Sequence, residues 1–415
     1  MHGQCTGQVH RTNNQHAVVV VSLSRHCELA VAATASSGLP VTFRVVGGPA
    51  SIQGGSLIVT NVGTVHLQAS QPGTATHDPV SETRVINQVA VSLSLEADRP
   101  TAPRSSQALH VHQGRVYVAQ GSDGLEILDA DPQSGLTRLG VFNTAGLTQD
   151  VQVDAGQAYL ADGPAGVAIL DVTNPGNPIG FNSVPSNSFT KRICLTEEHL
   201  LTAEHQLREG TAGMRIEPRN SGNGRGYFQT IGTCYDIRAS ANLAFLAEGF
   251  GLQILDISNP AAPVALGRYR TPGNDTLGLR VQGDLVYLAG ETLTIVDVSN
   301  PSEPHLVGTF PEGGTRLDLM GSLAMVATYQ GLQVVDVSAP ASPVSVGSKA
   351  IDGGASDVQV VGDLVYLAAA KAGVQVYRAR QSTPLTDQRG EGRTWQPRLS
   401  QTRTARQTPC GPFPG

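Results

Sequence analysis

Aspartates that recur at a nearly constant interval are the residues whose spacing first suggests chemistry. They close the related segments GLEILD, GVAILD, GLQILD, TLTIVD and GLQVVD, as Asp129, Asp171, Asp256, Asp297 and Asp336. Pro218 and Arg378 stand at the matching positions of two further copies, so a ring of seven functional aspartates is excluded. In LDISNP, Asp256 and Asn259 can hydrogen-bond the nearby backbone, and Pro260 presets φ for a turn. We therefore interpret these aspartates as turn residues, with ligand contact as the minor alternative.

Motifs of known catalytic chemistry are not found in the sequence, which has no GxSxG, HExxH, Walker loop or kinase motif set. His110 and His112 alternate on one face of a predicted strand, but no third metal ligand is evident. The cysteines form no CxxC pair, and a Cys194–Cys234 bridge is the alternative to free thiols. We expect no catalytic residue, no metal site and no cofactor.

Seven related units of about 41 residues, between residues 105 and 380, position these side chains. Each contains a second recurring piece, as in GRVYVA, GQAYLA and GDLVYLA. Short pieces rich in Val, Ile, Leu and Tyr, bounded by Gly, Asn, Asp and Pro, are typical of strands. Four antiparallel strands in about 40–45 residues are typical of a propeller blade. The sequence thus predicts an all-β fold with a seven-bladed β-propeller.

The seventh unit stops after its third strand, near Tyr377, which would leave the last blade with an unpaired edge. The segment VAVSLSL at 89–95 alternates apolar with small or polar residues and lies just before the first unit. We predict that it supplies the fourth strand of the last blade and closes the ring.

The segments IVDVSNP, VVDVSAP and ILDISNP, each preceded by a YLA-type strand, resemble the LVIVD repeat. The resemblance covers roughly residues 105–380 and implies a propeller found mainly in bacterial and archaeal surface or secreted proteins. It implies no catalytic residues. The third unit departs most from the pattern, with a longer loop at 204–213 and EPRNSGNGRGYF in place of the usual turn.

Counting along each unit from its second strand gives the residues expected at one mouth of the central channel. The charged members form a predicted binding rim, namely Asp150, Asp162, Arg192, Glu204, Asp236, Glu248, Arg316 and Asp357. Acids that converge at a rim create a focused negative potential, which would favour a cation or a basic partner surface. The alternative is that Asp–Arg pairs tie neighbouring blades together and the loop acids are solvated turn residues.

The flanks of the propeller differ from it. Residues 17–88 show alternating strands with turns at SSGLP, GGP and QPG, which predict a small β-sandwich. ASSGLPVTF and GTVHLQASQPG resemble the Ig-like repeats of large bacterial surface proteins, in which such a domain is a spacer. We expect residues 1–16 to be disordered or the start of a fragment, residues 89–380 to form the propeller, and residues 381–415 to be a disordered tail.

The composition excludes some classes of function. The 415 residues carry a formal charge of −6 and only 15% charged residues, so we expect no nucleic-acid partner. The longest apolar run near the start, AVVVV, is too short to span a bilayer, and no signal peptide precedes it. The protein is then cytosolic, or its true start lies upstream.

Three alternative functions are compatible with these observations. The first is a non-enzymatic cell-surface or secreted interaction and adhesion module with a protein or glycan partner. The second is an enzyme of hydrolase, lyase or quinoprotein type with its site in the channel. The third is a cytosolic scaffold.

Overall fold

The structure is a computed structural model. It describes the backbone of residues 40–48, 50–59, 65–71, 80–87, 90–100, 106–205, 212–219, 225–273 and 276–382, and of short strands at 8–11, 17–20, 27–30, 34–35 and 398–399. Two compact units are present, one of Val91–Arg380 and one of Met1–Ala90 with Gln381–Gly415. The predictions of disorder for 1–16 and 381–415 fall almost entirely outside the described residues.

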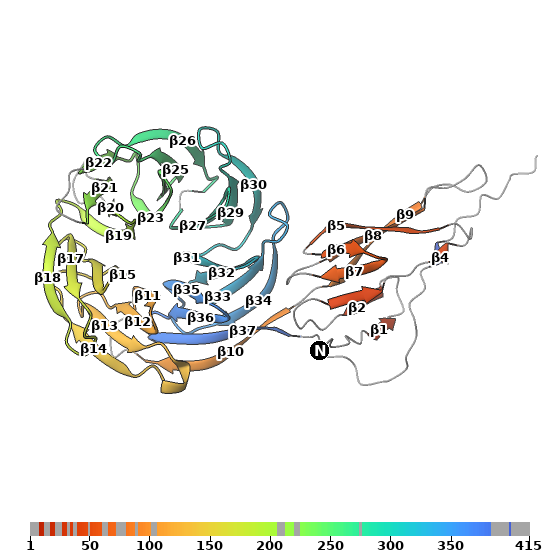
Figure 1. Cartoon of the computed structure of the whole chain (residues 1–415), viewed down its shortest axis with the longest axis horizontal. Helices are drawn as coiled ribbons and strands as arrows, with labels where there is room; N and C mark the ends of the chain where they lie inside the picture. Colours follow the sequence, from red (N-terminus) through yellow and green to blue (C-terminus); the bar gives the residue numbers. More distant parts are fainter. Residues whose placement is uncertain are drawn as a thin grey trace, which may run out of the picture. The chain divides into compact units, whose positions relative to one another are not determined.

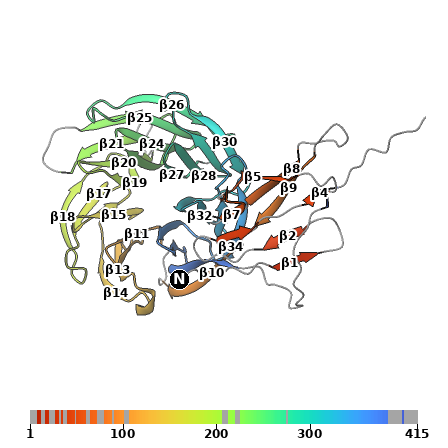
Figure 2. The ribbon, with the colours of Figure 1, turned by 45° about the vertical axis from the view of Figure 1, so that its right-hand side comes forward.

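Seven four-stranded antiparallel sheets form the larger unit, which Figure 1 shows as a ring and Figure 2 shows obliquely. The first blade, from the channel outward, is β11 (Ala108–His112), β12 (Arg115–Ala119), β13 (Leu125–Asp129) and β14 (Arg138–Phe142), with the 3₁₀ turn η1 (Pro132–Ser134) between its last two strands. The second is β15 (Asp150–Asp154), β16 (Gln157–Ala161), β17 (Val167–Asp171) and β18 (Ile179–Val184). The third is β19 (Phe189–Leu195), β20 (His199–His205), β21 (Gly213–Pro218) and β22 (Gly226–Gln229).

The remaining blades follow the same order. The fourth is β23 (Cys234–Ser240), β24 (Leu243–Glu248), β25 (Gly251–Asp256) and β26 (Val264–Arg270). The fifth is β27 (Gly278–Gln282), β28 (Leu285–Ala289), β29 (Leu293–Asp297) and β30 (His305–Phe310). The sixth is β31 (Arg316–Met320), β32 (Leu323–Thr328), β33 (Gly331–Asp336) and β34 (Val344–Ala350).

The seventh blade confirms the predicted closure of the ring. Its strands are β35 (Asp357–Val361), β36 (Leu364–Ala368), β37 (Val374–Ser382) and, outermost, β10 (Ala90–Arg99). The hydroxyls of Ser92 and Ser94 donate to the carbonyl oxygens of Arg380 and Arg378, at 3.2 and 3.4 Å. The last blade is therefore built from both ends of the propeller sequence.

Apolar side chains pack between neighbouring blades. Tyr117 and Ile127 of the first blade share a buried cluster with Val151 and Leu160 of the second. Such clusters also lie between the second and third blades, between the third, fourth, fifth and sixth in turn, and between the seventh and first. Burial of this surface holds the blades face to face.

A glycine recurs in most outer strands, where the strand lies against a turn of the next blade. A Cβ on Gly267 would lie 2.2 Å from the carbonyl oxygen of Pro301, which belongs to the turn of the next blade. Gly226 and Gly308 meet Pro260 and Pro340 in the same way, at 1.9 and 2.2 Å. Outer strand and neighbouring turn can approach this closely only where no side chain intervenes.

The smaller unit is all-β where it is described. One sheet orders β3 (Cys27–Ala30), β7 (Ser56–Val59) and β6 (Ala50–Gln53), and another orders β5 (Thr42–Gly47), β8 (Val65–Gln71) and β9 (Val80–Asn87). Leu57, Val65 and Leu67 form its buried apolar cluster. Two further pairs are β1 (Gln8–Arg11) with β2 (Ala17–Val20) and β4 (Thr34–Ala35) with β38 (Arg398–Leu399).

Candidate functional site

One face of the propeller holds all the residues of the predicted rim. The inner strands of the seven blades begin at this face, and the second strands end there, so the loops that follow the second strands lie on it. We call it the mouth face. The first residue of each inner stretch pairs with an alanine at the end of the second strand, as in Asp150 with Ala161 and Asp357 with Ala368. The register obtained by counting in the sequence is therefore confirmed.

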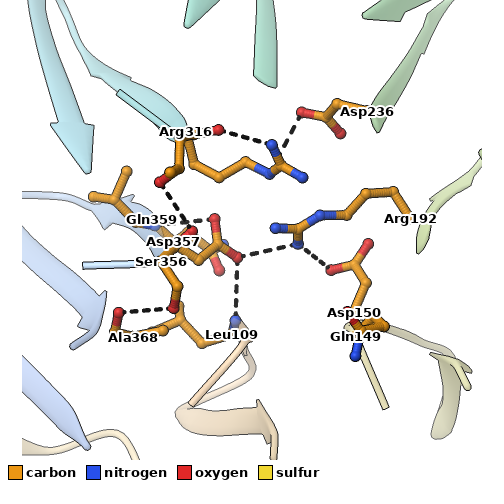
Figure 3. Close-up of polar contacts among 12 residues, drawn as sticks. Leu109, Gln149, Asp150, Arg192, Asp236, Arg316, Ser356, Asp357, Gln359 and Ala368 are labelled. Carbon is orange, nitrogen blue, oxygen red and sulfur yellow. Dashed lines mark hydrogen bonds and ion pairs between the residues drawn. The ribbon is translucent and has the colours of Figure 1, made fainter. Parts of the chain in front are cut away.

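Arg192 on β19 brings two aspartates of the rim together inside the channel. Its Nη1 donates to Asp150 Oδ1 at 2.9 Å and lies 3.5 Å from Asp357 Oδ2, as Figure 3 shows. Asp150 also accepts the N–H of Ile193 at 3.0 Å, and Asp357 accepts that of Leu109 at 3.2 Å. Each of these aspartates thus binds the backbone of the blade that follows its own.

Asp236 and Arg316 form the opposite side of the same ring (Figure 3). Asp236 is fully buried and accepts the N–H of Leu279 on the next blade at 3.0 Å. Arg238 Nη1 donates to Asp236 Oδ1 at 3.0 Å, and Arg316 Nε lies 4.0 Å from Asp236 Oδ2. Arg316 Nη2 donates to the carbonyl oxygen of Tyr235 at 3.0 Å. Two arginines and three aspartates therefore cross-link the blades, as the alternative prediction proposed.

A second layer of channel-facing side chains lies two residues further along the inner strands, and it was not predicted from the sequence. Residues on a strand alternate in direction, so the residue two positions further along each inner strand also faces the channel. Four of these accept an N–H of the next blade: His110 Nδ1 from Val153 (3.0 Å), Gln152 Oε1 from Leu195 (2.9 Å), Asp318 Oδ2 from Val360 (2.8 Å) and Gln359 Oε1 from Val111 (2.6 Å). Inner strands are sheet edges with unpaired N–H groups, and these side chains satisfy them.

The three loop acids of the rim lie apart from the channel ring, each inside its own blade. Asp162 and Glu204 are 1% exposed and Glu248 is 2% exposed. Arg268 Nη2 donates to Glu248 at 3.0 Å, yet burial raises the pKa of Glu248 above its ordinary value. These acids are not solvated, contrary to the structural alternative considered for them, because hydroxyl, N–H or arginine donors enclose each of them.

The charges of the ring shift one another's pKa. Burial would raise the pKa of Asp236, but Arg238, Arg316 and Arg192 lower it to about 2. Burial and the charge of Arg192 lower the pKa of Arg316 to about 10. Burial, Arg192 and Arg316 also lower the pKa of Lys191 to about 8. Burial would lower the pKa of Arg192, but Asp150, Asp357 and Asp236 raise it, so both cations and acids crowd this part of the mouth.

Lys191 reaches the mouth through an irregularity in β19. The register of β19 with β20 shifts between Thr190 and Arg192, which makes Lys191 an extra residue in its strand. Its Nζ donates to Gln149 Oε1 at 2.9 Å. The corresponding shift in β23 lies between Cys234 and Asp236. Counting along the repeats could not reveal these bulges, which occur in only two blades.

Aromatic and apolar side chains surround the charged part of the mouth. The rings of Phe189 and His205 are 6.2 Å apart, and those of His205 and Tyr235 are 5.9 Å apart. On the neighbouring loops Ile231 is 76% exposed, and Phe250 packs against Gly232. The mouth face over the third and fourth blades therefore combines cations with aromatic surface.

The metal and cysteine predictions can be compared with the described residues. His110 and His112 stack with centroids 5.8 Å apart, and His110 Nδ1 already accepts a backbone N–H. No group of three His, Cys, Asp or Glu side chains suited to a metal occurs in the part of the chain that the structure describes. Cys194 and Cys234 share one buried cluster but are free thiols, so the alternative of a bridge between them is wrong.

The turn aspartates have the structural role that the sequence predicted. Asp256 Oδ1 accepts the N–H of Ser258 at 2.8 Å, and Asn259 Oδ1 lies 3.3 Å from the N of Ala261. Asp171 and Asp297 accept from the residue two positions further on in the same way. These side chains close the turns of single blades.

Comparison with known proteins identifies the repeat. Residues 145–185, 231–271, 273–311 and 315–350 match the LVIVD repeat, and each match spans one blade from its inner to its outer strand. No curated protein has a matching sequence. The chain thus carries LVIVD repeats in its second, fourth, fifth and sixth blades.

Two solved structures are similar to this chain. The Pan2 WD40 domain of Neurospora crassa is 14% identical, with a TM-score of 0.57 over 73% of this chain and 98% of that domain. The computationally designed Ika8 protein is 10% identical, with a TM-score of 0.49 over 68% of this chain and 99% of Ika8. The first likeness shows a propeller fold and nothing further. Within the described residues, no helix is long and apolar enough to cross a membrane.

Proposed function

We propose that this propeller of LVIVD repeats is a non-enzymatic interaction module that binds an acidic segment of a protein partner at its mouth face. The observation that carries the proposal is that Lys191, Arg192 and Arg316 lie close enough at the channel mouth to shift one another's pKa. The positive charge of Arg192 lowers the pKa of both Lys191 and Arg316. A partner carboxylate placed there would relieve this repulsion.

The three channel aspartates of the rim are already paired. Asp150, Asp236 and Asp357 each accept at least one backbone N–H and lie within 4.0 Å of an arginine nitrogen. In contrast, the buried Nε atoms of Arg192 and Arg316 have no hydrogen-bond partner among the described residues. Donors therefore exceed acceptors at this side of the mouth, which supports an anionic ligand.

The surface around the cations supports a protein partner. Aromatic residues and arginine are enriched at the energetic centres of protein interfaces. The mouth face presents Phe189, His205 and Tyr235 beside the cations, and exposed Ile231 and Phe250 next to them. These residues occupy different positions of their repeats, so packing of the repeated blade does not explain them.

The compartment and the second domain belong to the same proposal. The LVIVD resemblance supports a cell-surface or secreted protein, and the resemblance of residues 17–88 to Ig-like repeats supports a spacer domain. The two three-stranded sheets with a common apolar cluster are consistent with a small β-sandwich. The genomic sequence upstream of Met1 tests this: an in-frame signal peptide would support it, and a stop codon directly upstream with no leader would contradict it.

The binding experiment measures fluorescence anisotropy of a labelled peptide of alternating Glu and Tyr, with a Lys–Tyr peptide of equal length as the reversed-charge probe. We expect the acidic peptide to bind, with an affinity that falls as salt rises. Lys191→Gln should weaken it by about fivefold or more. The matched control is Lys371→Gln, which removes an exposed lysine of the same face.

The other outcomes are informative. Binding of the Lys–Tyr peptide that disappears when Asp162, Glu204 and Glu248 are neutralised together would favour the basic or cationic partner predicted from the sequence. Acidic-peptide binding that Lys191→Gln leaves unchanged, in a variant with unaltered melting temperature (Tm), would remove the basis of the proposal.

An enzyme with its site in the channel is a second candidate, favoured by one observation. A lysine whose pKa is lowered toward neutrality, as that of Lys191 is to about 8, is a usable nucleophile or base. Screening the intact protein for hydrolase and lyase activity, with Lys191→Arg as the variant, tests it. Activity that Lys191→Arg abolishes would favour the enzyme over the interaction module.

A further inference from the structure

The described inner strands place four arginines on the channel, two in each layer, and these differ in how the chain pairs them. In the deeper layer Arg238 Nη1 donates to Asp236 Oδ1 at 3.0 Å, and Arg280 Nε donates to Asp318 Oδ1 at 2.8 Å. Each of these guanidinium groups therefore has a carboxylate of its own. The two arginines of the first layer are paired differently.

Arg316 is held by carbonyl oxygens and not by a carboxylate. Its Nη1 donates to the carbonyl oxygens of Leu277 and Thr315, and its Nη2 donates to that of Tyr235 at 3.0 Å. Asp236 Oδ2 lies 4.0 Å from its Nε, which is an ion pair without a hydrogen bond. The side chain of Arg316 is only 7% exposed. It is thus a buried cation to which no carboxylate of the described residues is hydrogen-bonded, and such a charge is costly.

Arg192 uses one nitrogen for two carboxylates and leaves another without a partner. Its bonds to Asp150 and Asp357 both come from Nη1. Its Nε is buried and has no hydrogen-bond partner in the described part of the chain, and the same holds for the Nε of Arg316. A buried N–H without an acceptor costs free energy. Two arginines, whose side chains are 8% and 7% exposed, therefore each keep a donor for which the chain provides no acceptor.

These two arginines approach each other in the channel. They come from the third and sixth blades, and Figure 3 shows both side chains extending into the channel with their guanidinium groups next to each other. After burial, the charge of Arg192 has the largest influence on the pKa of Arg316, which is lowered to about 10. The two positive charges are therefore close, and an acceptor between them would interact with both.

The charges that line the channel leave a positive excess. Its two layers contain four arginines and four aspartates, and Lys191 adds a fifth positive charge at the mouth. Burial lowers the pKa of His110 to about 4, so this histidine adds no charge near neutral pH. Buried charges in proteins are generally compensated by partners. One monovalent anion would balance the charges of the lining.

We propose that the channel holds one halide ion, chloride under natural conditions, between the Nε–H groups of Arg192 and Arg316. The inference rests on the surplus of donors that also supports the proposed function, and it names the ligand that the protein holds there without a partner. Lys191 is not a ligand of the ion in this proposal and contributes only its charge.

The crowding of the channel favours a halide over a larger anion. The five charged residues of the first layer are at most 9% exposed, and three of them are aspartates. The oxygens of a phosphate or an acetate would meet these carboxylates, whereas a halide is spherical, close to a water molecule in size, and accepts from two N–H groups in any direction. A water molecule can accept the same bonds but does not offset the charge, so the test must distinguish the two.

The first test locates the ion. Crystals of the intact protein are grown in sodium bromide and, at equal concentration, in sodium gluconate, and anomalous diffraction is measured at the bromine absorption edge. We expect an anomalous peak between the two Nε atoms in the bromide crystals only. Density without an anomalous signal would show a water molecule there, and anomalous peaks confined to the protein surface would show adventitious bromide. Either result would overturn the proposal.

The second test measures binding in solution. The linewidth of the chlorine NMR signal is followed with the intact protein at constant ionic strength, with gluconate as the replacing anion. The broadening should saturate and should be removed by bromide. Arg316→Lys keeps the charge but lacks the Nε–H, so it should weaken chloride binding about tenfold. Arg138→Gln, which removes an exposed arginine of β14, is the control and should change nothing.

Equal broadening in the wild type and in Arg316→Lys would contradict the site. The bromide crystals contain the wild type, so they decide the question even if Arg316→Lys fails to fold.

The halide site and the peptide site can fail separately, because chloride binding is measured without peptide and peptide binding can be measured in gluconate. Lys191→Gln should weaken chloride binding by no more than about twofold, since it removes a nearby charge but no hydrogen bond. A loss as complete as in Arg316→Lys would place the ion at the mouth and contradict the inference. Bromide in the channel of a protein that binds no acidic peptide would support the halide site and contradict only the proposed function.

Discussion

The aspartates of the outer turns and those of the channel lie at different places in the same blades and make different kinds of bonds. Asp256 accepts the N–H of Ser258, two residues away, whereas Asp236 accepts the N–H of Leu279, which is 43 residues away on the next blade. The first is at the surface and recurs with the repeat. The second is fully buried and recurs in only three of the seven blades, as Asp150, Asp236 and Asp357, since residues such as Gly278 and Ala108 stand at its position in other blades. The turn aspartate thus recurs in most units and closes local structure, whereas the aspartate bond between blades is made by only three of the units.

The pKa values of the two residues have different causes. The N–H and hydroxyl of Ser258 lower the pKa of Asp256, whereas three arginines lower that of Asp236 to about 2 against the effect of burial. If bonds between blades dominate stability, changes in the channel and at the closure should cost far more than changes in the turns.

The largest effect is expected from removing the closing strand. Deletion of residues 1–96 removes most of β10 and with it buried Val91, and it exposes the edge of β37. We expect Tm to fall by about 10 °C or more, measured by differential scanning calorimetry. Deletion of residues 1–88, which retains β10, is the control and should leave Tm nearly unchanged. Equal losses in the two deletions would show that the smaller unit, and not the closure, stabilises the ring.

Asp236→Ala is expected to have the next largest effect. It leaves the buried N–H of Leu279 without its acceptor and Arg238 and Arg316 without their counter-charge, which should lower the free energy of unfolding by about 3–5 kcal/mol. Asp236→Asn keeps an acceptor oxygen and should lose less. Chemical denaturation with urea measures both. A cost for Asp236→Ala no greater than that for Asp256→Ala would refute the contrast between channel and turn.

His110 makes the channel sensitive to pH. Burial, with His112, Arg280 and Arg238, lowers its pKa to about 4, although Asp357 acts in the opposite sense. The unfolded chain, with a pKa near 6.5, then binds the proton more readily, so stability is complete above pH 6.5 and falls by about 3 kcal/mol as the pH drops to 4. His110→Gln keeps an acceptor like those of Gln152 and Gln359 and should remove this part of the pH dependence. Parallel wild-type and variant curves of unfolding free energy against pH would contradict the assignment.

Asp256→Ala is expected to have the smallest effect. It removes one side-chain hydrogen bond within a half-exposed turn, and Pro260 and Asn259 still favour the turn. We expect a smaller fall in Tm than for Asp236→Asn. Asn259→Ala, in the same turn, should behave alike, and a loss comparable with that of Asp236→Ala would show that the turn supports the neighbouring blade.

The sequence could predict whatever depends on periodicity. The spacing of Asp171, Asp256 and Asp297 predicted the blades and their register, and the missing strand near Tyr377 predicted the closure by 89–95. It could not predict which rim residues meet. Arg192 lies near Asp357, 165 residues away, because the ring brings β19 and β35 to one channel.

Other features of the site depend on side-chain direction or on single-blade irregularities. The deeper layer with His110 and Asp318 could have been found by applying the alternation of strand residues once more. The bulge that places Lys191 could not be predicted from the repeat, because only the third and fourth blades have one at this place in the inner strand. The burial of Asp162 and Glu204 was also unforeseen, because the serine and threonine donors lie on a loop before the inner strand and not beside the acids in the sequence.

The strand β10 also governs when the molecule can be completed. It ends at Arg99, and its partner β37 begins at Val374, so about 275 residues are synthesised between the two. At roughly 5–20 residues per second, a ribosome takes roughly 14 to 55 seconds to cover that distance. During this time the six intervening blades can form in order, while β10 has no partner and the first blade has no seventh blade to pack against. In the nascent chain β10 therefore stays unpaired until β37 is synthesised, and ring closure is a late step of folding. Until then the exposed edge of β10 can bind a chaperone or pair with the β37 of a second chain.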